Sequence, residues 1–382
     1  MIDTPTSPSP GYGIENLPLG RCARNGYVIR YQDLALPSEG LGMSLDSTAA
    51  ITVNQLRELR SRAREAIESD SPYAGPTVAV SELELLTPVP VRAFIDFYSG
   101  IHHASNVGRM FRPDMPPLLP NYRHLPVAYN GRASSVVPSG VAIRRPYGIT
   151  RATPEADPEF GPTRELDFEL ELGVYFGSDT AMGQVVPIDA IESHLLGVVL
   201  VNDWSARDVQ RFEYQPLGPF LAKSFATSVS PWLVAMDALE PYRAEGPAQT
   251  PPVLPHLQPG RAGHYDIRLG VELWTPEAGW HTLSETNARE LYWSFAQQLA
   301  HQSSNGTPLE AGDLYATGTI SGPERGQFGS LLELTWRGSQ PIELANGATR
   351  TFLADGDRLR LTGMAGTSVN LGAVEAEILP AG

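Results

Sequence analysis

From Val91 to the C-terminus, the chain consists largely of short β-type runs separated by glycine and proline. The 36 glycines and 34 prolines are 70 of the 382 residues and follow no period, which is typical of a turn-rich protein and not of a fibrous repeat. The pattern favours a β-rich domain. We expect strands at residues 136–143, 167–176, 196–201, 265–274 and 331–336.

Residues 1–88 are expected to form a separate N-terminal unit with a different texture. Residues 27–31 read as a strand, and residues 52–68 place five apolar side chains at helical spacing with Arg and Glu opposite. The Pro-Val-Pro sequence at 88–90 is a plausible linker. A second helix is expected over 288–302. No internal repeat is found. The change of texture at the linker predicts two domains, 1–88 and 91–382.

Charge and composition exclude several classes of protein. The 28 Lys and Arg residues against 43 Asp and Glu give a net charge of −15 without a basic run, which disfavours binding to nucleic acid or to an anionic membrane. No apolar run approaches the ~18 residues that span a bilayer, and the polar start does not resemble a signal peptide. The single Cys22 excludes an intrachain disulfide and a cysteine-built zinc site. A cytoplasmic protein is the default expectation.

The segment LDFELEL, residues 166–172, alternates acidic and apolar side chains. On a strand, Asp167, Glu169 and Glu171 would share one face, and Phe168, Leu170 and Leu172 would share the other. A half-exposed strand with a solvated acidic face explains this pattern. Two carboxylates about 7 Å apart along a strand can instead converge on one hard cation.

A polar stripe follows the apolar run 198–201. After an expected turn at Asn202 and Asp203, the residues Asp203, Arg207, Gln210 and Tyr214 stand at i, i+4, i+7 and i+11, which is one face of a helix. An Asp–Arg pair at this spacing can be only a helix salt bridge. Carboxylate, guanidinium, amide and phenol groups on one face also suit a functional site.

The chain contains 27 arginines and one lysine, Lys223, nine residues after Tyr214. A position that keeps lysine in such a chain can require a compact ammonium that the planar guanidinium does not mimic. The alternative is a surface lysine that survived by chance. Its position just beyond the polar stripe favours a functional role.

The segment 95–112, which two glycines interrupt, gathers further polar side chains. It contains Asp96, Tyr98, His102, His103 and Arg112. Adjacent histidines on a regular element cannot both face one site, so at most one of them is expected to be catalytic. A lone histidine is also often only a structural hydrogen-bonding residue.

Together these segments predict an all-oxygen metal site. Its candidate ligands are Asp96, Glu169, Glu171 and Asp203. Such ligands favour Mg²⁺, Ca²⁺ or Mn²⁺. With an imidazole to take a proton from water and with Arg207 and Lys223 nearby, the set suits stabilisation of an enolate or oxyanion. No GxSxG elbow, Walker loop or GxGxxG after a strand supports a serine hydrolase, an NTPase or a dinucleotide-binding enzyme.

Five motifs in this order and spacing resemble the fumarylacetoacetate hydrolase family: DFY…HA.NVG.MFR, LP…Y.GRASSVV.SG, LDFELEL, NDWSARD.Q..EY.PLGPFL.KSF and GTISGPE…FGS.LEL.W. The resemblance covers the large domain and reaches the helix at 52–68. It implies a mixed α+β, β-rich protein with a small SH3-like N-terminal domain and a large β-roll catalytic domain that forms a homodimer. It also implies hydrolysis of a carbon–carbon bond in 4-fumarylacetoacetate, giving fumarate and acetoacetate at the end of tyrosine and phenylalanine catabolism.

The resemblance also implies roles for individual residues. The four acidic residues above would hold Ca²⁺ or Mg²⁺, and Lys223 and Thr227 would border a second cation site together with Asp203. His103, oriented by Glu333, would activate water. Arg207, Gln210 and Lys223 would stabilise the oxyanion and the departing enolate. The expected substrate contacts are Tyr98, Arg112, Tyr129, Gln210, Tyr214 and Thr319.

Some positions depart from the family pattern: Asn130 stands where His is usual, His102 where Gln or Glu is usual, Ala222 and Ala226 where Gly is usual, and 365–377 lacks a Gly-Phe-Gly. We interpret these as changes in the pocket wall, which leads to the hypothesis that the substrate differs at one end. The alternative enzyme is a hydrolase or decarboxylase of the same superfamily that acts on another acylpyruvate or β-diketo acid. The non-enzyme alternative is a metal- or ligand-binding protein.

Overall fold

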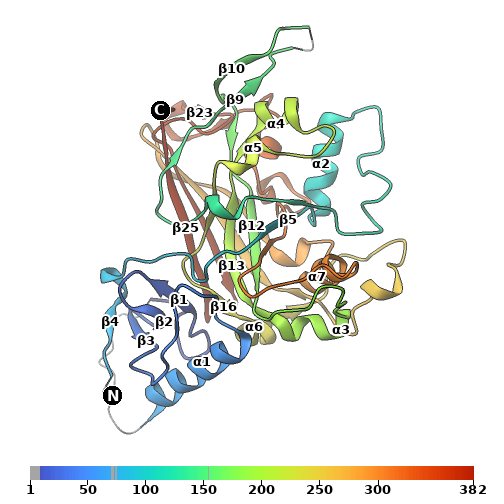
Figure 1. Cartoon of the computed structure of the whole chain (residues 1–382). Coiled ribbons are helices and arrows are strands. Elements are labelled where there is room, and N and C mark those ends of the chain that lie inside the picture. Colours follow the sequence, from blue (N-terminus) through green and yellow to red (C-terminus); the bar gives the residue numbers. More distant parts are fainter. Residues whose placement is uncertain (1–8, 70–72, 74, 154) are drawn as a thin grey trace.

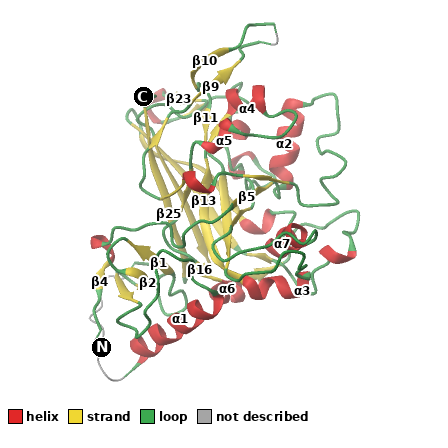
Figure 2. Cartoon of the chain, viewed as in Figure 1, coloured by secondary structure: helices red, strands yellow, loops and turns green. Residues whose placement is uncertain are grey.

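The computed structural model of the chain describes residues 9–69, 73, 75–153 and 155–382. Two large sheets form its body, and a smaller sheet with one long helix lies at one end (Figures 1 and 2). This arrangement confirms the expected strand-rich, mixed α+β class. No described helix combines the length and the apolar character that crossing a membrane requires.

The N-terminal residues form a four-stranded antiparallel sheet and the helix α1 (Val53–Glu68), as expected. Its strands are β1 (Leu19–Cys22), β2 (Gly26–Tyr31), β3 (Leu34–Pro37) and β4 (Val78–Ala79). Thr52 caps α1 reciprocally with Gln55, and the helix buries Leu56 and Leu59. The apolar cluster of this unit continues onto the large sheet. The SH3-like assignment and the boundary at 88 stay predictions.

The large sheet holds the strands that build the site. Its order is β6 (Ala128–Asn130), β5 (Phe94–Phe97), β21 (Leu314–Ala316), β12 (Leu170–Phe176), β13 (Leu195–Asp203), β15 (Thr227–Val229) and β7 (Val136–Pro138), with β16 (Val234–Ala235) also paired to β13. Val198 and Leu200 of β13 face one apolar cluster, whereas Val199 and Val201 face the other. The run is uninterruptedly apolar because both faces of this strand are buried.

The second sheet consists of longer strands that pack against the first. Its order is β20 (Gly279–Asn287), β19 (Ile267–Thr275), β24 (Arg358–Ala365), β25 (Val369–Leu379) and β8 (Ile143–Arg144). β24 and β25 contact β13, and the apolar cluster between the two sheets is the main core. Residues along β19 alternate between buried and less buried, as expected of a sheet covered on one face.

Short elements connect these sheets. The two-stranded pairs are β9 (Tyr147–Thr150) with β10 (Glu159–Pro162), β11 (Leu166–Asp167) with β14 (Ser205–Ala206), β17 (Arg243–Ala244) with β18 (His264–Tyr265), and β22 (Ile342–Glu343) with β23 (Thr349–Arg350). The other helices are α2 (Ile101–Phe111), α3 (Ile188–Ile191), α4 (Arg207–Glu213), α5 (Leu221–Ser224), α6 (Met236–Leu239), α7 (Phe295–Ser303) and α8 (Leu331–Leu334).

The expectation of a strand at 331–336 is wrong, because these residues begin with the helix α8. Ser330 is its N-cap and accepts a hydrogen bond from the backbone N–H of Glu333 at 3.3 Å. The Ser-Leu-Leu-Glu sequence is typical of a helix start, but the apolar residues after Ser330 led to the prediction of a strand. The helix expected over 288–302 begins later than predicted. A 3₁₀ turn (Ala288–Glu290) comes first, and Ser294 caps the start of α7.

Three expected strands are interrupted, and one of them is 265–274, which divides between β18 and β19. Residues 136–143 form β7 and β8, which belong to different sheets, and residues 167–176 divide between β11 and β12. The expected turn at Asn202 and Asp203 is also wrong, because β13 continues through Asp203. Asp203 is thus on a strand, while Arg207 begins α4, so the two do not share a helix face.

Candidate active site

Four buried carboxylates meet at one end of the large sheet. Asp96 comes from β5, Glu171 from β12 and Asp203 from the end of β13, and Glu169 immediately precedes β12. One oxygen from each lies within 4.8 Å of the others. Because β5, β21, β12 and β13 are consecutive neighbours in the sheet, pairing brings these residues together from distant parts of the sequence. The predicted convergence is confirmed.

The backbone supports this cluster at Gly318. Its N–H donates to Asp96 at 3.1 Å and to Glu171 at 3.0 Å. Gly318 has φ +75°, and a Cβ there would lie 2.2 Å from the carbonyl oxygen of Phe97. Only glycine fits so close to β5, which explains the residue at this position.

The electrostatics of the cluster suit a cation. Burial, followed by repulsion from neighbouring carboxylates, raises the pKa of Asp96 and of Glu171 well above the ordinary range. The buried Oε1 of Glu171 has no hydrogen-bond partner. Two ligands that each lie about 2.4 Å from one ion are at most about 4.8 Å apart. The donor set and its spacing therefore fit a divalent cation with oxygen ligands.

Lys223, the sole lysine, lies beside the cluster. Its side chain is 4 % exposed, and its Nζ donates to Glu169 and forms an ion pair with Asp203 at 2.9 Å. Burial alone would lower the pKa of Lys223, but Asp203 and Glu169 outweigh it and raise that pKa above its ordinary value. The ammonium is thus fixed as a buried cation, as its rarity in the sequence indicated.

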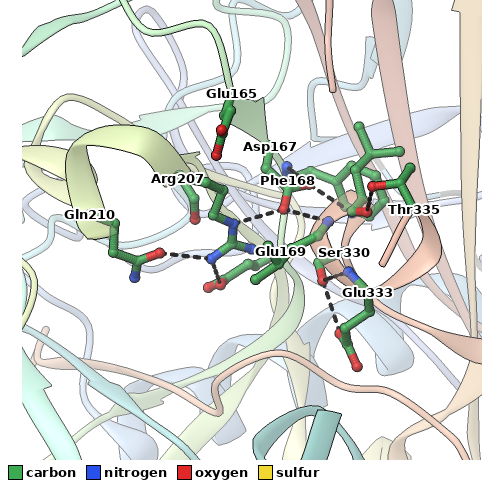
Figure 3. Close-up of polar contacts among 12 residues, drawn as sticks. Glu165, Asp167, Phe168, Glu169, Arg207, Gln210, Ser330, Glu333 and Thr335 are labelled. Carbon is green, nitrogen blue, oxygen red and sulfur yellow. Dashed lines mark hydrogen bonds and ion pairs between the residues drawn. The ribbon is translucent and has the colours of Figure 1, made fainter. Parts of the chain in front are cut away.

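Arg207 connects the cluster to α8 (Figure 3). Its guanidinium donates to Asp167 at 2.8 Å, to Glu169 at 2.7 Å and to Gln210 at 3.1 Å. Asp167 also accepts from the backbone N–H groups of Leu331 and Leu332. The expectation that Asp167 shares the face of Glu169 and Glu171 is wrong, because the break between β11 and β12 turns it toward α8. The alternative of an Asp203–Arg207 salt bridge within one helix is excluded, because Asp203 lies on β13 and Arg207 begins α4.

His103 is held by Glu333. Nδ1 of His103 lies 2.6 Å from Oε2 of Glu333, and both side chains are buried. Burial would raise the pKa of Glu333, but His103 and several hydrogen bonds lower it, so the carboxylate is ionised. An ionised carboxylate can only accept, so Nδ1 carries a proton, and in the neutral tautomer of the ring Nε2 carries the lone pair.

Three further residues orient Glu333, and the sequence analysis missed them. Asn106 donates to its Oε1, and Ser321 and Ser330 donate to its Oε2, each at 2.9 Å (Ser330 in Figure 3). Asn106 lies one turn after His103 on α2, which is the local signal that could have identified it. His102 points elsewhere, with its Nε2 3.6 Å from Glu290.

A cavity of about 570 Å³ opens beside these groups. His103, Arg207 and Lys223 line it together with all six expected substrate contacts, which are Tyr98, Arg112, Tyr129, Gln210, Tyr214 and Thr319. The hydroxyl of Tyr129 donates to Asp203 at 2.7 Å. Nε of Arg112 and Oγ1 of Thr319 are buried and have no hydrogen-bond partner, so two residues that line the cavity have polar atoms free to bind a ligand. Thr227 is outside the lining and donates to Asp203 at 2.7 Å.

The positions that depart from the family pattern do not line this cavity, and the interpretation of them as pocket-wall changes is wrong. Asn130 is exposed on β6, and Ala222 packs against Val209. His102 and Ala226 are also outside the lining, and residues 365–377 belong mainly to β25 in the other sheet. Sequence neighbours of catalytic residues can point away from the site, which only the tertiary structure reveals.

The chain is similar to known proteins over most of its length. Residues 92–378 match the family model described as the C-terminal part of fumarylacetoacetate (FAA) hydrolase. Fumarylacetoacetase from Bos taurus is 47% identical over 300 residues, which are 77% of this chain and 71% of that protein. Fumarylacetoacetase from Caenorhabditis elegans is 47% identical over 310 residues, or 80% of this chain and 74% of that protein.

Solved structures of lower identity share the fold. A fumarylacetoacetate hydrolase from psychrophilic Exiguobacterium antarcticum has a TM-score of 0.55 at 18% identity, with 95% of this chain and 99% of that chain covered. Maleylpyruvate hydrolase from Sphingobium has a TM-score of 0.55 at 16% identity over the same shares. These two likenesses concern the fold alone.

Proposed function

Because the chain belongs to the fumarylacetoacetate hydrolase family, we propose that it hydrolyses a carbon–carbon bond of 4-fumarylacetoacetate and releases fumarate and acetoacetate. The observation that carries the proposal is the His103–Glu333 pair, 2.6 Å apart, beside a cavity that Asp96 and Glu169 of the four-carboxylate cluster also line. Hydrolysis of a β-diketone needs both parts: a base for water and an electrophile for the carbonyl oxygen.

Asp96, Glu169, Glu171 and Asp203 would hold the divalent cation, for which Ca²⁺ and Mg²⁺ are the proposed ions and Mn²⁺ is an alternative. Such an ion would withdraw electron density from the diketone oxygens and lower the energy of the negative charge that develops there. The proposed second cation site beside Lys223 and Thr227 is supported by their contacts with Asp203.

His103 takes the proton from water in this proposal. Its Nδ1–H is committed to Glu333, so Nε2 is the basic atom, and Glu333 stabilises the imidazolium that results. The edge of the Tyr98 ring packs against the imidazole with ring centroids 5.4 Å apart. The imidazole is thus held from two sides before it takes the proton from water.

Cationic and amide groups receive the negative charge that develops. Arg207 and Lys223 are buried beside Glu169 and stay protonated, so they can stabilise an oxyanion and the enolate of the departing acetoacetate. Gln210 accepts from Arg207 through Oε1, which leaves its NH₂ group to donate to substrate. Arg112 and Thr319, with their unpaired buried atoms, would contact the substrate together with Tyr98, Tyr129 and Tyr214.

The decisive experiment follows the ultraviolet absorbance of the diketone in 4-fumarylacetoacetate with added Mg²⁺, Ca²⁺ or EDTA. We expect fast loss of absorbance with metal and little with EDTA. Glu171→Gln removes the negative charge of one of the four proposed metal ligands. It should therefore raise the metal concentration needed for half-maximal activity by about tenfold or more. Metal binding without turnover of this substrate or of any acylpyruvate would contradict the proposal and favour a binding protein.

The identity of the substrate can be tested at Asn130. Because this side chain is exposed and outside the cavity, Asn130→His should leave kcat/KM for 4-fumarylacetoacetate within about twofold of the unchanged protein, as is usual for surface substitutions. A panel of acylpyruvates measured with both proteins serves as the comparison. A large change in preference upon this substitution would mean that Asn130 reaches the substrate, and the alternative β-diketo acid would then be favoured.

We also propose that the protein is a homodimer, that it acts in the cytoplasm and that it completes tyrosine and phenylalanine breakdown. The family resemblance supports the dimer and the pathway, and the single cysteine supports a reducing compartment. The division into domains at 88 and 91 is supported by the separate N-terminal sheet.

A further inference from the structure

The turn after α8 has an unusual backbone. Trp336, Arg337 and Gly338 have φ values of 46°, 59° and 79°, which lie in the left-handed region. Two successive residues with a Cβ rarely adopt this conformation. The turn is fixed by backbone hydrogen bonds, including Arg337 N–H to the carbonyl of Leu332 at 2.7 Å and Gln340 N–H to that of Thr335 at 2.8 Å.

This turn directs Arg337 back toward the cavity. Its guanidinium carbon lies 4.8 Å from the centroid of the Phe111 ring, and Phe111, the last residue of α2, lines the cavity. Arg337 itself is exposed. The strained turn therefore holds an exposed cation at the rim of the cavity, against a side chain of its wall.

A second arginine lies at the same rim. Arg211 of α4 lines the cavity and forms two hydrogen bonds with Glu165, at 3.0 and 3.1 Å. Burial, and then repulsion from Arg211, lower the pKa of Arg337, whereas Glu165 raises it, so the three charges are neighbours. No described carboxylate lies within ion-pair distance of Arg337, and Glu165 is paired with Arg211 at 3.0 Å. Two arginines therefore lie near one carboxylate that pairs only with Arg211, although the whole chain carries −15.

We propose that Arg337 and Arg211 form a cationic rim that captures dicarboxylate substrates as they enter the cavity. The inference rests on the proposed function, in which the substrate carries two carboxylates. A strongly acidic protein repels a dianion at long range, and a local positive rim beside a low-dielectric cavity reverses the field where the substrate enters. Arg337 acts on capture and not on the reacting bond.

The test compares Arg337→Asn with Arg337→Lys. Asparagine tolerates the left-handed backbone, so the turn is kept while the charge is lost, and lysine restores the charge. At about 10 mM ionic strength, we expect Arg337→Asn to lower kcat/KM by about three- to tenfold with kcat unchanged, and at about 1 M, where the Debye length falls from ~30 to ~3 Å, the difference should vanish. Arg337→Lys should retain most of the rate.

A matched control is Arg57→Asn, which removes an exposed arginine from α1 in the N-terminal unit and changes net charge equally. It should leave kcat/KM unchanged. An equal loss in both Asn variants would overturn the rim, because the effect would then belong to the net charge. A loss in Arg337→Asn that persists at high salt would also overturn it.

Calorimetric binding of fumarate, a dicarboxylate, provides a readout without turnover. The affinity of the unchanged protein should fall with salt, and that of Arg337→Asn should be lower and less salt-dependent. If 4-fumarylacetoacetate is not hydrolysed but this binding difference is found, the rim stands and the proposed function fails. If hydrolysis is fast and fumarate binds equally to both proteins, the rim is wrong.

Discussion

Replacing His103 by alanine is expected to lower kcat for 4-fumarylacetoacetate by at least about 10²–10⁴-fold, the usual contribution of a general base. The imidazole is buried and donates its Nδ1–H to Glu333, and His103 lines the cavity. No other described histidine lines this cavity, so none can take over. Initial rates at saturating substrate and metal give the loss.

His103 is not one of the clustered acidic ligands, so metal affinity should be preserved in His103→Ala. Titration with Mg²⁺ or Ca²⁺ separates a lost base from a lost cation. The neighbouring His102→Ala is the matched control, because this side chain points toward Glu290 and lies outside the cavity. Near-normal rates in His103→Ala, or equal losses in both variants, would refute the assignment of the base.

Lys223→Arg is expected to reduce kcat by about 10²-fold or more although charge is conserved, because a guanidinium cannot take the place of a compact ammonium. The Nζ lies between Glu169 and Asp203, and Arg207 already donates to Glu169 at 2.7 Å. A second planar guanidinium would have to enter a fully occupied corner, which forces neighbours from their rotamers.

Lys223→Met separates charge from shape in the same position. If charge alone mattered, Lys223→Arg would be far more active than Lys223→Met, whereas our expectation is that both are severely impaired. Circular dichroism and the thermal midpoint of each variant show whether the fold is retained. Removal of one partner from a buried ion pair destabilises a protein by about 3–5 kcal/mol, so Lys223→Met should unfold at a lower temperature. Activity of Lys223→Arg close to that of the unchanged chain would contradict the role of the ammonium.

The candidate site was largely predictable from the types of residue that its chemistry needs. Four acidic residues, a histidine and a solitary lysine stand out against an arginine-rich chain, and all lie at or beside one cavity. The fold was predictable only as a class. The positions of glycine and proline indicate where strands end, but they do not predict which strands pair.

The wrong predictions for residues 331–336 and for Asp167 share a physical cause. Residues 331–336 were expected to be a strand because a short apolar run has no decisive period, and only the Ser330 cap identifies a helix. Asp167 was expected beside Glu169 because alternation assumes an unbroken strand, and the break before β12 redirects it to Arg207 and α8. Local periodicity predicts a face only where the element is continuous.

The sequence by itself determined which chemical groups this protein can use, because side-chain type sets charge, basicity and ligand preference wherever the chain folds. The tertiary structure decided which of these groups meet. Asp96 joins Glu171 because β21 pairs with both β5 and β12, and His103 rather than His102 faces the cavity because Glu333, 230 residues away, accepts a hydrogen bond from its Nδ1. Asn130 is excluded from the cavity by the same packing. Such long-range contacts depend on strand pairing and on the core between the sheets, which no local pattern contains.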